Sequence, residues 1–322
     1  MPAERDEMIE LSEDRPPYPV ESISVPVDDS RSIAVWRSGG ADRIGDRKIA
    51  LVTPGFARRM RNMVVPAMYL AANGFTVYRC DYVDHIGTSD GDIWNFTMSG
   101  MRDSIRALHD YVRTAEGDCD TVIVGASLSM RAAYRLAAEN GGISGIVGIV
   151  GVVDTAYTFE RVFNEDITKR IVEDVDPHDY VTFEKNRIGC LPFLHDWYEQ
   201  DWVGLSGTIK DVERLDCGLV NFCGTADTWI DVRDVRQVFD AARKGGRVVE
   251  LPFVEHELSS NPVAAQTLLR EATLAVMEMA GRVSREDGNF AADFVEPEFG
   301  DIASQIPYER RLAMAEIASA TF

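Results

Sequence analysis

The sequence is short of basic residues and contains no long apolar run. Only 33 lysines and arginines stand against 53 acidic residues, which leaves a formal net charge of −20. A surface of that sign repels nucleic acid phosphates and anionic lipids, so we expect neither as a partner. No uninterrupted apolar segment is long enough to cross a bilayer, and residues 1–15 lack the apolar stretch of a signal peptide. We therefore expect a cytoplasmic protein that does not bind a membrane.

Cysteine and histidine are also scarce, with five residues of each. An odd number of cysteines argues against a secreted disulfide framework, and no two of them form a C-x-x-C pair. No two histidines are spaced like zinc ligands beside a glutamate. The sequence therefore predicts neither a metal site nor a cofactor.

Apolar runs of strand length alternate with segments of helical periodicity. The predicted strands are Lys48–Thr53, Thr76–Asp81, Thr121–Val124, Ile146–Val153, Gly218–Gly224 and Val248–Phe253. The predicted helices are Asn62–Ala72, Thr97–Thr114, a segment ending at Ala138, and Pro262–Met279. This alternation predicts an α/β fold with a mostly parallel central sheet and helices on both faces. Two earlier alternating stretches, Ser22–Val27 and Ser32–Arg37, predict an antiparallel edge.

One long stretch, residues 154–216, interrupts the alternation between two predicted strands. It is polar and irregular but rich in aromatic residues, which favours an inserted cap that packs on apolar surface over a solvated excursion. The predicted core is then residues 20–153 and 217–281. Residues 1–19 are expected to form a flexible N-terminal extension, and residues 282–322 a C-terminal segment that packs on the core.

The run Gly125-Ala126-Ser127-Leu128-Ser129 joins an apolar strand to a helical pattern. Small residues two positions before and after a serine are typical of the nucleophile elbow of the α/β-hydrolase fold, where strand and helix crowd together. If Ser129 were the nucleophile, Arg131 would occupy that crowded position, so we favour Ser127. Ser127 could otherwise be a simple helix N-cap.

Partners for this serine follow in the chain order Ser, Asp, His that is typical of the fold. Asp227 comes just after the predicted strand Gly218–Gly224, and His256 follows the last predicted strand. Asp231 and Asp234 are alternatives for the acid, but they lie deeper in a helical pattern. A serine hydroxyl is a poor nucleophile near neutral pH, so His256 would take its proton while the aspartate orients the imidazole.

The reaction would also need two N–H donors for the developing oxyanion. Leu128, at the start of the helix after the serine, would supply one, and Phe56, in the turn after Lys48–Thr53, would supply the other. The segment from Asp81 to Gly91 resembles a loop that borders the active-site floor in many α/β hydrolases.

Several runs together resemble one family more closely. They are Gly55-Phe56-Ala57-Arg58-Arg59-Met60, Asn73-Gly74-Phe75, Asn95-Phe96-Thr97-Met98, Ala126-Ser127-Leu128-Ser129, Val150-Gly151-Val152-Val153, Asp293-Phe294-Val295-Glu296-Pro297-Glu298-Phe299 and Glu309-Arg310-Arg311-Leu312. In this order they resemble the acyl transferase of bacterial bioluminescence, a myristoyl-acyl-carrier-protein thioesterase. The resemblance implies cleavage of long-chain acyl thioesters to supply a reductase complex, with Ser127, Asp227 and His256 as the triad.

The sequence departs from that family at two places outside the serine element. Asp227-Thr228 replaces a double aspartate, and Asp84-His85 replaces a His-His pair. Residues 154–216 also match poorly, and because a cap would shape the acyl tunnel with its aromatic side chains, acyl length and head group stay open. The acceptor of the acyl group, the pathway and the oligomeric state stay open too.

The leading hypothesis is a serine acyl-thioesterase or acyltransferase acting on a fatty acyl thioester of acyl-carrier protein or CoA, with a reductase or biosynthetic enzyme as a candidate partner. The alternatives are a carboxylesterase or other hydrolase with the same triad, and a non-catalytic ligand-binding protein. A basic cluster of Arg58, Arg59 and Arg61 would hold a phosphate or the carrier, or would form ordinary ion pairs. His85 and Trp229 are further candidates for binding substrate or carrier.

Overall fold

The computed structural model describes residues 16–39, 48–117, 119, 121–170, 174–281 and 291–320. Within these residues, eight strands form one sheet in the order β1-β2-β4-β3-β5-β6-β9-β10. In chain order they are β1 Val20–Pro26, β2 Ser32–Gly39, β3 Lys48–Thr53, β4 Phe75–Cys80, β5 Thr121–Ala126, β6 Ile143–Ile149, β9 Gly218–Gly224 and β10 Gly246–Leu251. The pairs β1–β2 and β2–β4 are antiparallel, and the rest are parallel.

The burial of the strands follows from their place in the sheet. Every residue of β4 is buried, as expected for a parallel strand covered on both faces, whereas β1 at the edge is mostly exposed. Together with the strand order, this confirms the predicted fold class, the α/β-hydrolase fold with a mostly parallel central sheet. The predicted strand Ile146–Val153 is wrong at both ends, because β6 runs from Ile143 to Ile149. It stops there because Val150 turns the chain with a φ of 46° and donates its N–H to the Phe222 carbonyl.

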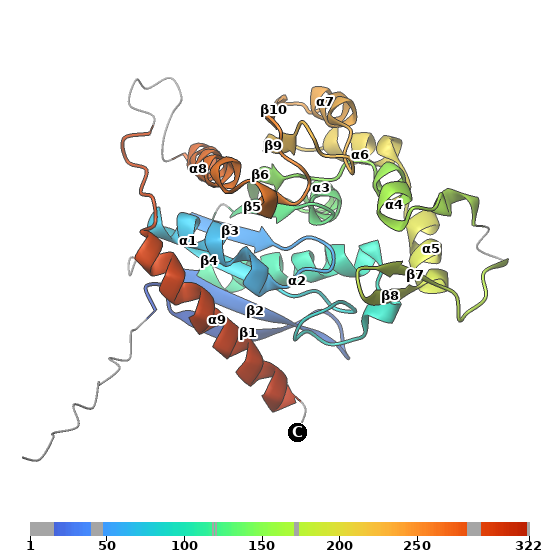
Figure 1. The fold of residues 1–322 in the computed structure, drawn as a ribbon, viewed down its shortest axis with the longest axis horizontal. Helices are drawn as coiled ribbons and strands as arrows, with labels where there is room; N and C mark the ends of the chain where they lie inside the picture. The colour runs from blue at the N-terminus through green and yellow to red at the C-terminus, as the bar shows by residue number, and fades with distance from the viewer. Residues whose placement is uncertain are drawn as a thin grey trace, which may run out of the picture.

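Among the described residues, six helices flank or cross this sheet (Figure 1). They are α1 Val64–Ala72, α2 Met98–Glu116, α3 Ser129–Glu139, α7 Val232–Asp240, α8 Pro262–Met279 and α9 Phe299–Ala320. A Cβ at Gly145 would meet Met279 of α8, whereas one at Gly148 would meet Met130 of α3. Positions three apart on a strand point to opposite faces, so α8 and α3 cover opposite faces of the sheet.

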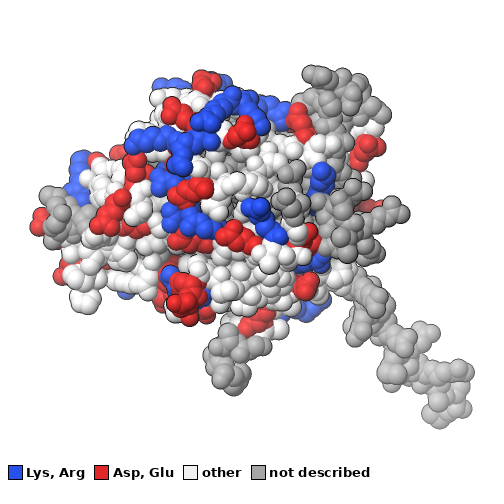
Figure 2. Space-filling model, turned by 180° about the vertical axis from the view of Figure 1, so that it is seen from behind, with Lys and Arg blue, Asp and Glu red and all other residues white. Residues whose placement is uncertain are grey.

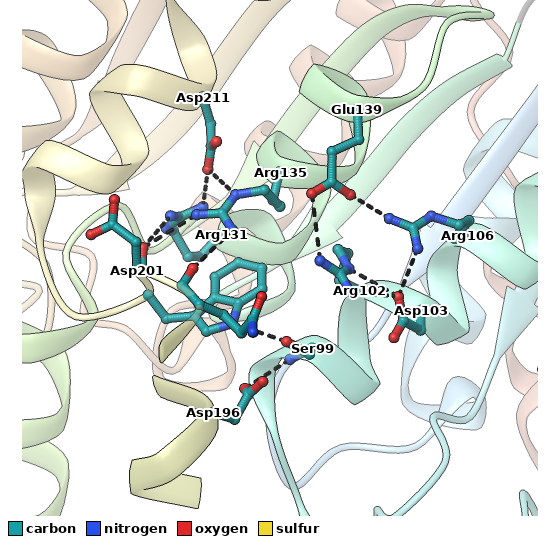
Figure 3. A network of polar contacts seen from close by, with 12 residues as sticks. Ser99, Arg102, Asp103, Arg106, Arg131, Arg135, Glu139, Asp196, Asp201 and Asp211 are labelled. Carbon is teal, nitrogen blue, oxygen red and sulfur yellow. Dashed lines mark hydrogen bonds and ion pairs between the residues drawn. The ribbon is translucent and has the colours of Figure 1, made fainter. Parts of the chain in front are cut away.

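The segment between β6 and β9 forms a separate group of elements beside the sheet (Figure 1). It contains α4 Thr155–Phe163, η3 Ile167–Lys169, the antiparallel hairpin of β7 Tyr180–Phe183 and β8 Asn186–Gly189, α5 Cys190–Glu199 and α6 Leu205–Val212. Arg131 and Arg135 of α3 both bond Asp211 of α6, and both guanidinium groups stack on Trp202 (Figure 3). These contacts fasten the inserted segment to the helix that begins beside Ser127.

Helix α9 lies across the antiparallel edge of the sheet (Figure 1). Arg79 of β4 is fully buried, and its two terminal nitrogens reach the two carboxylate oxygens of Glu309 at 2.7 and 2.8 Å. Farther along the helix, Glu316 accepts a hydrogen bond from the Trp36 indole of β2. Most of the predicted N-terminal extension and part of the predicted C-terminal segment lie outside the described residues.

The surface does not carry its negative charge evenly. On the face seen in Figure 2, basic side chains gather along the top of the view with acidic ones among them. Surface ion pairs include those between Arg102 and Glu139 and between Lys210 and Asp201. Among the described residues, no helix combines the length and apolar character that a bilayer span requires.

Candidate active site

Ser127 lies in a sharp turn between β5 and α3. Its φ is 52°, a left-handed conformation that is strained for a residue with a side chain. Two backbone hydrogen bonds hold the turn: the Ser127 N–H donates to the Ile149 carbonyl at 2.9 Å, and the Val152 N–H donates to the Ser127 carbonyl at 3.0 Å. Gly125 is needed because a Cβ there would stand 2.6 Å from the sulfur of Met130. The turn therefore presents the Ser127 side chain at the end of the strand.

Ser129, the competing serine, has a different environment. It is fully buried, and its hydroxyl donates to the Ala126 carbonyl at 2.9 Å and accepts from Thr53 at 3.2 Å. It therefore packs the junction of β3, β5 and α3. The interpretation of Ser127 as a helix N-cap is also wrong, because α3 begins at Ser129 with Leu128 as its N-cap.

Three side chains from distant parts of the chain form one hydrogen-bonded series. The His256 Nε2 lies 2.8 Å from the Ser127 Oγ, and its Nδ1 lies 2.8 Å from Asp227 Oδ2. Asp227 follows β9 and His256 follows β10, so neighbouring parallel strands bring the two residues together. If Nδ1 carries the hydrogen toward the aspartate, Nε2 is left to accept the serine proton.

The surroundings of the imidazole keep this series in place. The Asp227 side chain is 1% exposed and the His256 side chain 9% exposed. The second oxygen of Asp227 accepts the Trp229 backbone N–H at 2.8 Å, and the Trp229 ring lies 4.5 Å from the imidazole, centroid to centroid. The alternative acids lie elsewhere, since Asp231 caps α7 and pairs with Arg233.

Two backbone amides next to the serine remain without an acceptor. Neither the Phe56 N–H nor the Leu128 N–H donates a hydrogen bond to another described residue. Both residues line the cavity that contains Ser127. Gly55 brings the Phe56 turn close, because a Cβ on it would lie 3.2 Å from the Ser127 Cβ. The arrangement can hold a negatively charged oxygen beside Ser127.

His85 is placed behind this turn and does not line the cavity. Its side chain is buried, and its Nε2 accepts the Ala57 N–H at 3.0 Å. Burial lowers the pKa of His85 to about 4, so the imidazole is neutral near pH 7 and one nitrogen can accept. The other nitrogen, Nδ1, faces the Ile86 carbonyl at 3.3 Å. The structure thus places His85 as a support for the Phe56 turn and not, as predicted, against substrate.

The arginines of the predicted basic cluster have separate environments. Arg58 bridges Glu184, in the β7–β8 turn, and Glu257, next to His256, at 2.7 and 2.8 Å. Arg58 lines the cavity, whereas Arg59 and Arg61 do not. The ion pairs of Arg58 match the simpler of the two predicted roles. A role for the cluster in carrier binding stays a prediction.

The cavity around Ser127 has a volume of about 930 Å³ and is mostly apolar. Phe159, Phe183 and Trp229 form its wall on the side of the inserted segment. Trp197 and Trp202, which contributed to the prediction of a cap, are fully buried and do not line it. Within the described residues, no three His, Cys, Asp or Glu side chains gather as a metal site requires.

The rest of the cavity wall was not predicted from the sequence. It comes from α1, α8 and the start of the C-terminal segment, including Tyr69, Leu269, Glu296 and Phe299. The sequence signal for the C-terminal part of the wall was the run Asp293–Phe299. This run resembles the corresponding run of the family, but it gives no indication of what it contacts.

Comparison with known proteins gives consistent similarities. The sequence profile of the acyl transferase family matches residues 19–319. An acyl transferase of Shewanella hanedai is 30% identical over 89% of this chain and 92% of its own length. An acyl transferase of Vibrio campbellii is 30% identical over 92% of this chain and 94% of its own length, and that of Photorhabdus luminescens is 29% identical over 89% and 91%.

Solved structures with the same fold are more distant in sequence. Est1E from Butyrivibrio proteoclasticus with bound ferulic acid superposes with a TM-score of 0.61 at 15% identity, covering 80% of this chain and 96% of that one. The esterase domain of a Rhodothermus marinus protein gives 0.57 at 18% identity, covering 80% and 98%. At these identities the likeness concerns the fold.

Proposed function

This chain belongs to the acyl transferase family of bacterial bioluminescence, and from that membership we propose that it is a serine acyl transferase and thioesterase. Its substrate in this proposal is a fatty acyl thioester carried by acyl-carrier protein or by CoA. Ser127 is the nucleophile, His256 the general base and Asp227 the residue that orients it. An acyl reductase is a fitting recipient of the product, as in the family.

The first half of the reaction forms an acyl-enzyme. The Ser127 oxygen attacks the thioester carbonyl carbon while His256 Nε2 takes the hydroxyl proton. The carbonyl oxygen becomes an oxyanion and receives the Phe56 and Leu128 N–H groups. The C–S bond then breaks, and the leaving thiol takes the proton from His256. Asp227 stabilises the charged imidazole during these steps.

The second half releases the acyl group by the same route. His256 takes a proton from water or another acceptor, whose oxygen attacks the acyl carbon of the ester on Ser127. The second tetrahedral intermediate collapses, the C–O bond to Ser127 breaks, and the serine oxygen regains a proton from the imidazole. Water as acceptor yields a fatty acid.

One observation carries this proposal. An unbroken series of two 2.8 Å contacts joins Asp227, His256 and Ser127 inside an apolar cavity that also contains two N–H groups without acceptors. A non-catalytic binding protein would not need this combination. A carboxylesterase would need it, so the thioester part of the proposal rests on family membership.

Intact-mass spectrometry after mixing with acyl-carrier protein bearing a tetradecanoyl group tests the proposal. We expect a mass increase of one acyl group on the wild-type enzyme and none on Ser127→Ala. Turnover of the variant should fall by at least about a thousandfold. Ser129→Ala serves as the matched control and should still be acylated. Equal turnover by wild type and Ser127→Ala would disprove the mechanism.

Paired substrates separate thioesterase from esterase. The same acyl group is offered as a p-nitrophenyl ester and as thioesters of N-acetylcysteamine and acyl-carrier protein. If Arg58 contacts the carrier, Arg58→Glu should raise KM for the carrier-bound substrate alone, because the carrier is anionic. A strong preference for the oxygen ester would favour the carboxylesterase.

A further inference from the structure

The cavity extends from Ser127 into a groove between α1 and α8. One wall carries Pro66 and Tyr69 of α1, and the other carries Pro262, Ala265 and Leu269 of α8. On α8 the spacing of three and four residues places these side chains on one face of the helix. Positions 262 and 269 are seven residues apart, so that wall runs for about 10 Å.

A segment of the C-terminal region, residues 294–299, closes the far end of this groove; we call it the strap. The Asn73 side chain, just past α1, donates to the Val295 carbonyl and accepts the Val295 N–H, each at 2.8 Å. The next residue, Glu296, accepts the Tyr69 hydroxyl of α1 and the Gln266 amide of α8, each at 2.7 Å. The strap therefore joins the two helices that form the groove.

The chemistry of the groove selects between the two halves of an acyl thioester. Its sides are mainly apolar, and its closed end carries the carboxylate of Glu296. The nearby cation, Arg270, lies over the Phe294 ring, 5.0 Å from its centroid. A carboxylate at this end disfavours the phosphate of a pantetheine arm, whereas apolar walls favour an alkyl chain.

An exposed aromatic residue marks the end of the groove. Phe299 lines the cavity although 85% of its surface is exposed. Val263, at the start of α8, is 76% exposed. Exposed apolar side chains beside a cavity are typical of a binding surface. Phe299 therefore presents an apolar ring beside the strap, where the methyl end of a long chain would arrive.

We propose that the alkyl chain of the substrate lies in the α1–α8 groove, with its methyl end toward the strap, and that the strap sets the longest chain that fits. This inference rests on the proposed function of Ser127. It replaces the sequence-based expectation that aromatic residues of the inserted segment hold the chain. Phe159 and Phe183 on the opposite wall then face the thiol side of the substrate.

A series of N-acetylcysteamine thioesters, from butanoyl to hexadecanoyl, tests the inference. In the wild type we expect kcat/KM to rise by roughly fourfold for each added methylene until the groove is filled, because each methylene leaves water. Ala265→Phe would block the middle of the groove. It should lower kcat/KM for the tetradecanoyl thioester by at least about tenfold and keep the butanoyl value within about threefold.

Two further variants locate the effect. Thr267→Phe adds similar bulk to α8 at an exposed position outside the cavity, and it should leave the chain-length profile as in the wild type. Val162→Phe adds bulk on the inserted-segment side of the cavity. A profile that shortens in Val162→Phe, with or without a change in Ala265→Phe, would overturn the inference, as would a wild-type rate independent of chain length.

The same measurements separate failure of the inference from failure of the proposed function. Turnover of the butanoyl thioester and acylation of Ser127 report the function alone. If the wild type lacks both, the proposed function is wrong. If both are present and Ala265→Phe keeps the wild-type profile, only the groove assignment is wrong.

Discussion

The Nε2 atom of His85 accepts a 3.0 Å hydrogen bond from the backbone N–H of Ala57. Ala57 has a φ of 54°, a strained conformation, and it directly follows Phe56, whose N–H is one of the two oxyanion donors in the proposed mechanism. A strained backbone persists only when its surroundings hold it. In the proposed mechanism, the buried, neutral imidazole would therefore be a positioning group for the oxyanion donor.

Replacing this imidazole should affect the rate more than substrate binding. His85→Leu leaves the Ala57 N–H without a partner, and we expect kcat to fall by about tenfold or more, because losing an oxyanion donor costs two to three powers of ten. His85→Gln can still offer an oxygen to that N–H and should restore most of the rate. Steady-state kinetics with a short acyl thioester would measure both constants, with kcat referred to the concentration of folded enzyme so that a general loss of folding is not counted as a slower rate. Equal effects of both variants would contradict the positioning role.

The same residue should make stability depend on pH. Burial lowers the pKa of His85 from 6.5 to about 4 in the folded chain. Between these values the unfolded chain takes up the proton and the folded chain does not, so unfolding is favoured as the pH falls. The stabilisation is complete above about pH 6.5 and declines toward pH 4. Urea unfolding of His85→Gln across this range should show a smaller decline than the wild type; an equal decline would assign the effect to other groups.

The sequence predicted the hydrogen-bonded series of Ser127, His256 and Asp227, but it did not predict what supports the turn beside it. Ser127, Asp227 and His256 each follow a strand of a parallel sheet, and parallel strands end at one edge, so chain order alone predicts their meeting. His85 acts on a backbone N–H of a neighbouring turn, and no side-chain pattern records which amide a buried imidazole will reach. From the sequence it was predicted as a contact for substrate or carrier.

The end of a strand was predicted less well where the backbone turns without any change in the type of side chain. The apolar run Ile146–Val153 continues past the end of β6, and its last residues hold the serine turn: the Val152 N–H donates to the Ser127 carbonyl. Apolar periodicity indicates burial, not conformation, so it could not show that the strand ends at Ile149.

Gly125 should be irreplaceable for a steric reason. A Cβ at this position would lie 2.6 Å from the Met130 sulfur and 2.9 Å from the Ser129 hydroxyl. We expect Gly125→Ala to lower stability by about 1–3 kcal/mol and to move the serine turn, with a loss of activity larger than the loss of folded protein. Gly141→Ala is the matched control, since a Cβ there would meet nothing within 4 Å. Calorimetry and active-site labelling would check both, and normal labelling of Gly125→Ala would contradict the steric account.

The ion pair between Arg79 and Glu309 shows why the position of α9 could not be predicted. The two residues are 230 positions apart, and each looks like an ordinary surface charge in the sequence. In the structure their side chains are 0% and 3% exposed. Burial of both charges is possible only because the guanidinium and the carboxylate meet at two points.

Removing one partner of this pair should therefore destabilise the protein strongly. Glu309→Ala leaves a buried, unpaired guanidinium, and we expect a loss of about 3–5 kcal/mol in the free energy of unfolding. The double variant Arg79→Met with Glu309→Leu leaves no buried charge and should recover much of that loss. Arg310→Ala, at the exposed neighbouring position, should change stability by less than about 0.5 kcal/mol. Urea unfolding of the three variants measures the differences. A loss of unfolding free energy in Glu309→Ala as small as that in Arg310→Ala would contradict this account. It would mean that α9 does not pack on the sheet in solution, because a charge as deeply buried as that of Arg79 cannot lose its partner without cost.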